Sequence, residues 1–364
     1  MSTLLIKQPA ALLAFLKARP AMWIAFLAVA AALLIGLLLV HLIGVPIGDA
    51  VAAFAEGAWG SPYAIAASIN RSLVFALVGL GFVLADRANL TNVGGEGQIA
   101  IGGIVATAVS LYGHVSDLPF GLAFLLPLLA ASLAGGLWGG LAGVLKARAG
   151  TNEVIATLLL SFIAVWMVYG SVQSVALLRQ PMTHSNTLPE SLEIPDPTKL
   201  PLLTDDYSMP LHSGLLFGFA LAIVVALVLN KTVFGLRLRA VGLNPLAARR
   251  AGIAISASVV GVLFAAGALG GLAGACMLQG EQYSLKAGFS SGYGFDGLVV
   301  GLLARGSVVG VIAGALLFGF LRSGGINMEM VAAVPTALVV VIQGLIIVIL
   351  AGAALSMQRW EVER

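Results

Sequence analysis

Residues 89–98 read NLTNVGGEGQ, and they follow an apolar run at 62–85 and lead into a second one at 97–115. The stretch combines polar side chains with glycines, so its backbone is not expected to form a regular helix that faces lipid. Irregular backbone at membrane depth is tolerated only where protein buries it or where it lines a water-filled cavity. The stretch therefore predicts a membrane segment that is broken near its start.

The composition indicates that lipid is the main solvent of the chain. Of the 364 residues, 60% are hydrophobic and 10% are charged, whereas a soluble domain carries roughly a quarter charged residues. The 45 glycines favour close approach of helices in a bilayer. The net charge of +3 does not suggest nucleic acid as a partner, and one cysteine with four scattered histidines predicts neither a disulfide nor a metal site. We therefore expect an all-α polytopic membrane protein.

Apolar runs near 20 residues mark the expected crossings, because a helix of about that length spans the hydrocarbon layer. Runs of this length occupy 22–45, 62–85, 97–115, 119–145, 153–177, 213–230, 253–279 and 331–355. Two shorter apolar pieces lie at 294–304 and 307–321. If both cross, the chain has about ten transmembrane helices, with short re-entrant or broken segments among them. The membrane domain would then occupy 22–355, between a cytoplasmic segment, 1–21, and a C-terminal tail, 356–364.

The distribution of charge predicts the orientation. With ten crossings and a cytoplasmic N-terminus, most lysines and arginines fall on the inner side, and an inner loop at about 231–252 is strongly basic. The longest outer loop, at about 178–212, is instead acidic and rich in proline. Positive charge on the cytoplasmic side is the general rule for membrane proteins. We therefore expect both ends of the chain in the cytoplasm.

Two pairs of segments suggest an internal repeat. GGEG at 94–97 is similar to GFDG at 294–297, and KARAGTNE at 146–153 is similar to RSGGINME at 322–329. The expected topology puts the second pair on opposite sides of the membrane, as in an inverted repeat. Chance similarity between glycine-rich membrane sequences is the alternative explanation.

Polar residues of the broken segment are candidates for a solute path. Asn92, Glu96 and Gln98 could line such a path or brace the loop that forms it. Glu96 could instead cap the helix that starts nearby, because the positive end of a helix dipole favours an acid. Asp296 allows the same two interpretations. Thr-Asn-Glu at 151–153 has the pattern of an ordinary helix start.

Two polar residues lie inside other expected spans. Arg71 would be costly there without a partner, so it should face other helices, a water-filled path or a carboxylate, unless it reaches the outer surface. Gln343 is a further candidate for the path, although one amide can also simply join two helices.

Within the basic inner loop, residues 237–253 have the sequence features of a short helix. Asn244 and Pro245 can start a short helix and Gly252 can end it. Such a helix would carry Leu246 beside Arg249, which suits docking on a soluble partner. A basic helix lying on lipid headgroups is the alternative.

No motif predicts bond-making chemistry. The sequence contains no glycine–lysine phosphate loop, no catalytic triad motif and no hydrolase-type pair of carboxylates. An intramembrane enzyme would need clusters of His, Asp or Ser within the spans. We therefore predict that the chain is not an enzyme, holds no cofactor and relies on another chain for any ATP hydrolysis.

Four segments resemble the permease family of bacterial ATP-binding cassette (ABC) uptake transporters for nucleosides and simple sugars, which is related to branched-chain amino-acid permeases. The segments are NVGGEGQ at 92–98, NEVI at 152–155, RAVGLNPLAAR at 239–249 and GYGFDG at 292–297. The resemblance covers roughly residues 60–355. The long outer loop resembles that of the larger permease in nucleoside systems, so a nucleoside is the first expectation and a simple sugar the second.

The resemblance implies partners and a place in the cell. It implies an ABC ATPase subunit, a second permease that is either a relative or an identical copy, an extracytoplasmic solute-binding protein, and a position in the bacterial inner membrane. The implied contact with the ATPase is a coupling helix with the residues Arg239, Gly242, Asn244, Pro245, Ala248 and Arg249. An ion-driven secondary transporter with broken helices and a branched-chain amino-acid permease are the alternatives.

Overall fold

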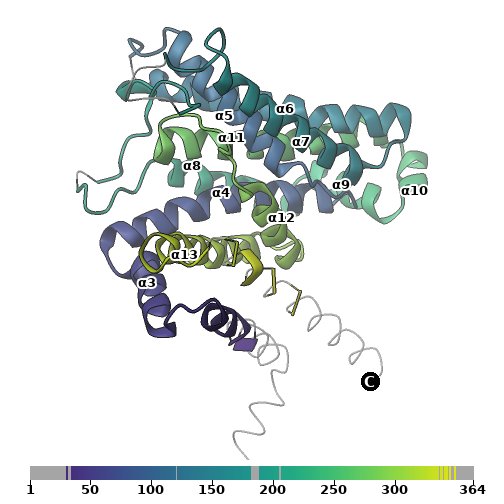
Figure 1. The fold of residues 1–364 in the computed structure, drawn as a ribbon. Helices are drawn as coiled ribbons and strands as arrows, with labels where there is room; N and C mark the ends of the chain where they lie inside the picture. The colour runs from purple at the N-terminus through teal and green to yellow at the C-terminus, as the bar shows by residue number, and fades with distance from the viewer. Residues whose placement is uncertain are drawn as a thin grey trace, which may run out of the picture. The chain divides into compact units, whose positions relative to one another are not determined.

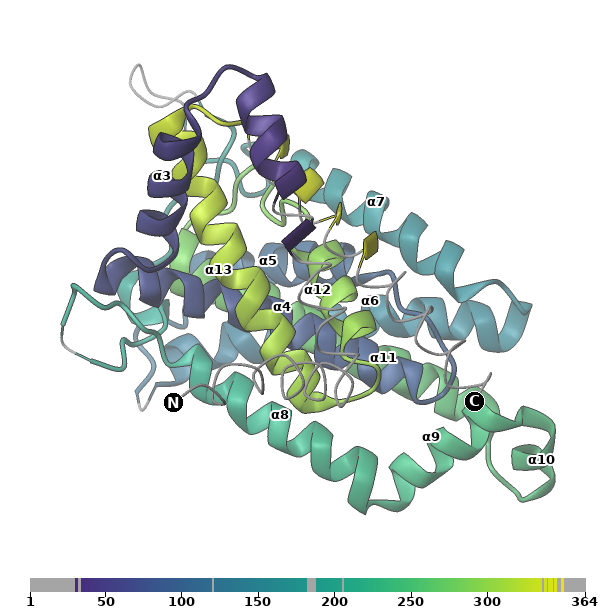
Figure 2. The same ribbon diagram turned by 90° about the horizontal axis from the view of Figure 1, so that it is seen from below.

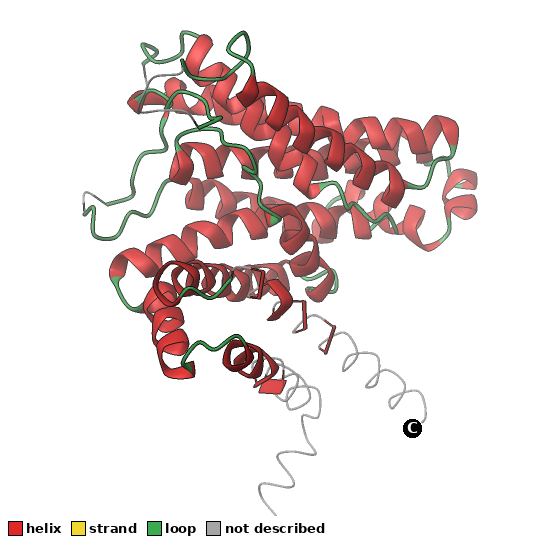
Figure 3. Ribbon diagram, viewed as in Figure 1, coloured by secondary structure: helices red, strands yellow, loops and turns green. Residues whose placement is uncertain are grey.

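The computed structural model describes residues 30–31, 34–119, 121–181, 188–204, 206–335 and short stretches at 337–338, 340–342, 344–345 and 348–349. In this part of the chain all regular elements are helices, and backbone pairing between extended segments is limited to isolated bridges (Figure 3). The predicted all-α class is therefore confirmed. The chain forms two compact units, one from 61–320 and one from the described parts of 1–60 and 321–364.

The larger unit contains most of the helices (Figure 1). They are α4 (Pro62–Asp86), α5 (Gly95–Tyr112), α6 (Leu122–Ala149), α7 (Glu153–Gln173), α8 (Gly214–Lys231), α9 (Val233–Leu243), α10 (Pro245–Arg250), α11 (Ile255–Met277), α12 (Tyr293–Leu303) and the first part of α13 (Val308–Ala332). In the larger unit, α10 and the long loop between α7 and α8 lie at opposite ends of the helices (Figure 1).

Six of the described helices are long and apolar enough to cross a membrane: α4, α6, α7, α8, α11 with the turn that follows it, and α13. The predicted crossings at 62–85, 119–145, 153–177, 213–230 and 253–279 are thus found as helices, with ends shifted by a few residues. The predicted crossing at 97–115 is α5, which is mostly buried inside the protein. The chain has the architecture of a multi-pass membrane protein.

Glycines hold α6 and α11 in backbone contact. A Cβ on Gly135 would lie 2.4 Å from the Gly267 carbonyl oxygen, and a Cβ on Gly267 would lie 2.2 Å from the Gly135 carbonyl oxygen. Gly139 and Gly271 repeat the close approach at four-residue spacing. Without a hydrophobic force between helices in lipid, such small residues let dispersion and backbone contacts hold the pair. The predicted small-residue interface is therefore present.

The region after α11 differs from the prediction. α12 is helical, but its 11 residues extend only about 16 Å, roughly half of the hydrocarbon thickness. It cannot cross by itself, contrary to the interpretation of 294–304 as a full crossing. α13 is longer than the predicted apolar piece at 307–321, because it continues through residues 322–327, which include polar side chains.

The smaller unit explains the continuation of α13. Besides this part of α13 it contains α3 (Ile47–Trp59), a helix that the sequence did not predict, and the described residues 34–42 are also helical. Asn327 donates from its amide to the Ala53 carbonyl at 2.7 Å, and a Cβ on Gly324 would lie 2.5 Å from the Phe54 ring. The polar and small residues of this part of α13 are therefore accommodated by α3. The predicted crossings at 22–45 and 331–355 are described only in part. Residues 30–31 and 34–42 of the first and the described stretches within 337–349 of the second are helical.

Candidate functional site

The predicted break lies between α4 and α5. Asn89 adopts a left-handed conformation with φ 55°, and α5 begins only at Gly95. The side-chain amides of Asn92 and Gln98 pair reciprocally at 3.2 Å, and Asn92 Oδ1 also accepts the Gly94 N–H at 2.9 Å. Both amide side chains are buried. Because they satisfy each other, they brace the loop in this structure.

Helix α7 fixes the same loop from the side. The Val93 N–H donates to Thr157 Oγ1 at 3.1 Å, and the Gly97 N–H donates to Ser161 Oγ at 3.2 Å. Ser161 lies about 12 Å along the axis from the first residue of α7. The start of α5 is therefore displaced into the helix bundle, and the segment before it enters the bundle as irregular backbone.

Glu96 joins the start of α5 to the start of α12. It lies in the first turn of α5, yet its carboxylate accepts the Gly292 N–H at 2.9 Å and the Gly294 N–H at 2.8 Å. Glu96 is only 5% exposed. A Cβ on Gly294 would lie 2.0 Å from the Glu96 nitrogen, so the two backbones touch. The carboxylate therefore caps a second helix that lies far away in the sequence.

The two similar glycine–acid–glycine segments meet at this contact. Asp296, the counterpart of Glu96, is half-buried in the first turn of α12. The other similar pair behaves differently. Residues 146–153 contain the end of α6 and the start of α7, where Asn152 caps the helix by accepting the Val154 N–H at 2.9 Å. Residues 322–329 instead lie inside α13, so this similarity does not correspond to a shared local structure.

Arg71 lies close to a carboxylate, one of the surroundings considered for it. Its Nε is 3.8 Å from Glu281 Oε2. Glu281 belongs to a π-helical turn, Leu278–Gln282, which follows α11. Such turns frequently occur at functional sites. Glu281 Oε1 has no hydrogen-bond partner among the described residues, and the neighbouring Asn70 donates to the Pro210 carbonyl at 2.8 Å.

Glu281 does not stand out as a functional residue in the sequence. Two features of the sequence could have indicated it: Glu281 directly follows the apolar run of α11, and Arg71 is an arginine within a predicted span, which needs a partner. No local pattern connects the two, because 210 positions separate them in the sequence.

The long outer loop is held against the end of α11. Backbone N–H groups of Ser191, Ile194 and Leu200 donate at 2.9 Å to carbonyls within 279–285. Lys199 bonds to Asp196 at 2.7 Å and to Glu193 at 2.6 Å, and these bonds raise the pKa of its ammonium. The described part of the loop is therefore a structured cover over the π-helical turn.

His212 is buried where this loop enters α8. Its ring packs on Gly280, where a Cβ would lie 2.6 Å from the ring. Burial lowers the pKa of His212 to about 4. The side chain is 1% exposed and its Nδ1 has no hydrogen-bond partner in the described part of the chain. His212 is therefore uncharged at neutral pH.

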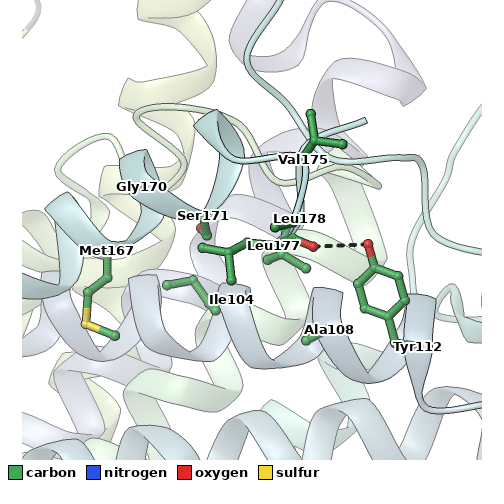
Figure 4. Close-up of a pocket in the computed structure, with 10 residues that line it drawn as sticks. Ile104, Ala108, Tyr112, Met167, Gly170, Ser171, Val175, Leu177 and Leu178 are labelled. Carbon is green, nitrogen blue, oxygen red and sulfur yellow. Dashed lines mark hydrogen bonds between the residues drawn. The ribbon is translucent and has the colours of Figure 1, made fainter. Parts of the chain in front are cut away.

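A pocket of about 840 Å³ lies between α5 and α7 (Figure 4). Ile104 and Met167 contribute to its mostly apolar lining, and the Tyr112 hydroxyl donates to the Leu177 carbonyl at 3.1 Å at one end. The predicted path residues do not line this pocket. Because its walls offer few hydrogen-bonding groups, we do not assign a polar solute to it.

The basic inner segment folds as two helices. α8 and α9 meet at a sharp bend, and α10 follows (Figure 2). Asn244 caps α10 by accepting the Ala247 N–H at 3.0 Å, Pro245 is its first residue, and Gly252 follows its end with φ 80°. The predicted short helix is thus confirmed. Leu246, 72% exposed, and Arg249 stand on its surface.

The other residues of this segment have distinct surroundings. Ala248 is the buried residue of α10, and Arg239 is exposed on α9. A Cβ on Gly242 would lie 2.6 Å from the Arg87 carbonyl, so the segment is held against the end of α4. Gln343, the last predicted path residue, lies outside the described residues. Among the described residues no group of three His, Cys, Asp or Glu could hold a metal ion.

Comparison with known proteins identifies the family. Residues 64–351 match the family described as the permease component of branched-chain amino acid transport systems. A guanosine ABC transporter permease of Bacillus subtilis is 33% identical over 87% of this chain and 89% of the relative. A glucose ABC transporter permease of Haloferax volcanii is 34% identical over 88% of this chain and 85% of the relative.

A third relative gives the same class of protein. A nucleoside ABC transporter permease of Lactococcus lactis is 29% identical over 78% of this chain and 79% of the relative. No solved structure matches the chain. Since the family match covers most of the helices described above, the chain belongs to the family of branched-chain amino acid transport system permease components, and it is the permease of an ABC transporter.

Proposed function

We propose that this permease carries a nucleoside into a bacterial cell. The observation that carries the proposal is the similarity to the guanosine permease, which extends over 87% of this chain and 89% of that relative. The nucleoside permease of Lactococcus lactis supports the same solute class. A simple sugar is the second candidate, because the glucose permease is 34% identical over 88% of this chain. Both solutes are uncharged and rich in hydroxyl groups.

The proposed energy source is ATP hydrolysis on a separate ABC ATPase subunit. The proposed contact is α10 with the adjoining end of α9, where exposed Leu246 and Arg249 offer an apolar and a cationic group. Asn244 and Gly252 define the ends of α10. The helix would therefore stay folded while it passes a movement of the ATPase on to the membrane helices. A second permease, related or identical, and an extracytoplasmic solute-binding protein complete the proposed transporter.

We place α10 and the N-terminus in the cytoplasm and the loop between α7 and α8 outside, with the bacterial inner membrane as the location. The basic character of the α10 segment and the acidic character of the outer loop support this orientation. Six of the described helices can cross the membrane. The proposed total is ten crossings, of which two combine irregular backbone with a helix: the segment ending in α5 and the segment ending in α12.

The two broken segments support an inverted repeat. In each, an acid lies between two glycines in the first turn of the helix, and the two helix starts are in contact at Glu96 and Gly294. α5 also packs on α11, and α12 packs on α4. The proposed axis passes through this contact. In alternating access the two halves of the permease would tilt about this axis. Packing that differs between the outward-open and inward-open states would let a ligand that binds one state better shift the balance towards that state.

The test is uptake by the complete transporter in proteoliposomes. The permease, the ATPase, the second permease and the binding protein are reconstituted together. Uptake of radiolabelled guanosine and of radiolabelled glucose is then measured, once with ATP on the side of the membrane that carries the ATPase and once with ATP on the opposite side. We expect saturable guanosine uptake that requires ATP on the ATPase side. Glucose uptake without guanosine uptake would establish the second candidate. Uptake driven by an ion gradient after ATP removal would contradict the ATP-driven mechanism.

A further inference from the structure

Partly exposed side chains follow one face of α4 from its first turn to Arg71. Tyr63 is 63% exposed, and Ala67 and Arg71, about one and two turns further along, are partly exposed. Residues four apart lie on the same face of a helix, so these three form one row. The other partly exposed row in this half of α4 contains Ile65 and Ile69, which suit lipid. Because an intramembrane arginine is costly in lipid, the row that ends at Arg71 faces water or a polar solute.

The residues beside this row are polar. Residues 281–284 read Glu-Gln-Tyr-Ser, and all four are partly exposed. Glu281 Oε2 is 3.8 Å from Arg71 Nε, and the two side chains are 20% and 21% exposed. Tyr283 interacts electrostatically with both Glu281 and Tyr63. The π-helical turn and the row on α4 therefore present polar groups to the same space.

The exposed row ends at Arg71. One turn further along α4, Phe75 is completely buried, and its ring stacks on that of Tyr293 with 4.9 Å between the ring centroids. The ring of Phe318 meets Phe75 edge-on at 6.2 Å. Arg71 and Glu281 therefore lie at the deep end of the exposed row, directly before a closed layer of aromatic rings. A solute that enters along the row would stop there.

The backbone at this place is strained, and one acceptor is unused. Tyr283 has φ 56°, a left-handed conformation that a tyrosine rarely adopts, and such strain clusters at ligand-binding sites. The α7–α8 loop holds this residue, because the Ile194 N–H donates to its carbonyl at 2.9 Å and Lys199 Nζ lies 4.8 Å from its ring centroid. Glu281 Oε1 has no hydrogen-bond partner among the described residues. The terminal bond of a glutamate rotates easily, so Oε1 can turn to the exposed part of the side chain.

We propose that Arg71 and Glu281 form a solute site that is entered from the side of the α7–α8 loop and recognises two neighbouring hydroxyl groups. Glu281 accepts a hydrogen bond from one hydroxyl, and the Arg71 guanidinium donates to the oxygen of the next. The opposite charges of the two residues balance, so the site does not require a charged solute. The choice of hydroxyl groups rests on the proposed function, since the ribose of a nucleoside and a simple sugar both carry such pairs.

The first experiment compares guanosine with 2′-deoxyguanosine, which lacks one hydroxyl of the pair. Uptake by the complete transporter is measured with the binding protein saturated by each solute, so a change of the ratio in a variant belongs to the permease. A hydrogen bond to a charged group gives about tenfold preference or more, and a neutral acceptor gives roughly half of that free energy. We expect guanosine to be carried about tenfold faster by the wild type and about threefold faster or less by Glu281→Gln. Equal ratios would overturn the proposal and leave a structural ion pair.

Glu190→Gln is the matched control. Glu190 is also a carboxylate with a cationic partner, Lys286 Nζ at 3.6 Å, and its side chain is 17% exposed, but it belongs to the α7–α8 loop. This variant should keep the wild-type ratio of the two solutes. A fall as large as that in Glu281→Gln would contradict a specific site at Glu281.

The second experiment tests the entrance without a solute, and it keeps the proposal testable if Glu281→Gln does not fold. Ala67→Cys and Ile69→Cys are each produced in the full chain with the other subunits, and intact spheroplasts are treated with a charged thiol reagent. Both positions are partly exposed, but only Ala67 lies on the row that leads to Arg71. We expect labelling of Ala67→Cys alone, because a charged reagent does not enter lipid. Any other result would overturn the proposal.

The experiments also separate this proposal from the proposed function. If the transporter carries glucose and not guanosine, the nucleoside proposal fails, and the site is tested in the same way with glucose and 2-deoxyglucose. If the transporter carries guanosine with equal ratios in the wild type and Glu281→Gln, the solute site is rejected and the proposed function remains.

Discussion

At the residue scale, glycines set the distances between backbones. The contact between Gly294 and Glu96 is closer than any other side chain would permit, since a Cβ would lie 2.0 Å from a backbone nitrogen. A flexible neighbour could move away, but a backbone atom in a helix start cannot do so without disturbing the hydrogen bonds of Glu96. This makes Gly294 a structural requirement of the contact between α5 and α12.

Gly294→Ala should therefore destabilise the protein. The new methyl group collides with backbone, which costs about 3 kcal/mol or more, and we expect a fall of about 5 °C or more in the unfolding midpoint. Gly261→Ala in α11 is the matched control, because nothing lies within 4 Å of its Cβ position. Alanine is more favourable than glycine in a helix by up to about 1 kcal/mol, so this variant should be as stable as the wild type or more stable. Equal midpoints for the two variants would refute the close contact.

His212 should make stability depend on pH. Its pKa is about 4 in the folded protein because of burial, against about 6.5 in an unfolded chain. The unfolded chain therefore takes up the proton first, so stability is complete above pH 6.5 and falls as the pH drops towards 4. Between pH 7 and pH 5 the loss amounts to about 2 kcal/mol.

The measurement is the unfolding midpoint of the wild type and of His212→Gln across this pH range. The variant has no group that titrates at position 212, so we expect its midpoint to fall less steeply than that of the wild type. His114→Gln, at an exposed position, is the control and should behave like the wild type. Parallel curves for the wild type and His212→Gln would contradict the role of His212.

At the element scale, α10 shows how far local sequence can determine a helix. Asn244, Pro245 and Gly252 lie within nine positions of one another, and their cap, first-residue and end functions were all predictable. The structure confirms each of them.

The double variant Asn244→Asp, Arg249→Glu tests the proposed docking of α10. Aspartate still caps a helix, so α10 should persist while its surface turns acidic. We expect unchanged membrane insertion but uptake reduced about tenfold or more, equivalent to roughly 1.4 kcal/mol of lost coupling. Arg148→Glu, an exposed charge reversal at the end of α6, should reduce uptake less. Normal uptake by the double variant would reject the docking surface.

α12 and α13 show where local sequence fails. Polar residues at 322–327 predicted an end for the apolar segment, but Asn327 donates to Ala53 and Gly324 packs on Phe54, both on α3. A polar residue ends a membrane helix only when nothing satisfies it. Here the acceptor is supplied by a helix that lies 274 positions earlier in the sequence.

At the scale of the whole molecule, the proposed orientation can be tested with cysteine labelling. The single native cysteine, Cys276, is buried and should give little background. Tyr207→Cys lies in the outer loop at a position 83% exposed, and Leu246→Cys lies on α10 at a position 72% exposed. In intact spheroplasts, a membrane-impermeant thiol reagent should label Tyr207→Cys alone, and Leu246→Cys only after permeabilisation. Labelling of Leu246→Cys in intact spheroplasts would reverse the orientation.

The candidate site was only partly predictable. The sequence identified the break before α5 and the acid within it, because polar residues and glycines interrupt an otherwise apolar run. It suggested that Glu96 could cap the helix of its own segment, whereas its carboxylate binds α12. It also suggested a carboxylate for Arg71 but could not identify Glu281. The role of these residues in solute transport stays a prediction.

The sequence by itself determined that this chain is a multi-pass helical membrane protein, where most of its described helices lie, and how α7 and α10 begin. These properties follow from hydropathy and capping, which act within one helix or within a few residues. Only the tertiary structure decided that α13 continues past its polar residues and that Glu96 joins two helix starts. A buried polar group must find its partner wherever packing brings one, and such partners here lie about 200 positions or more away in the sequence.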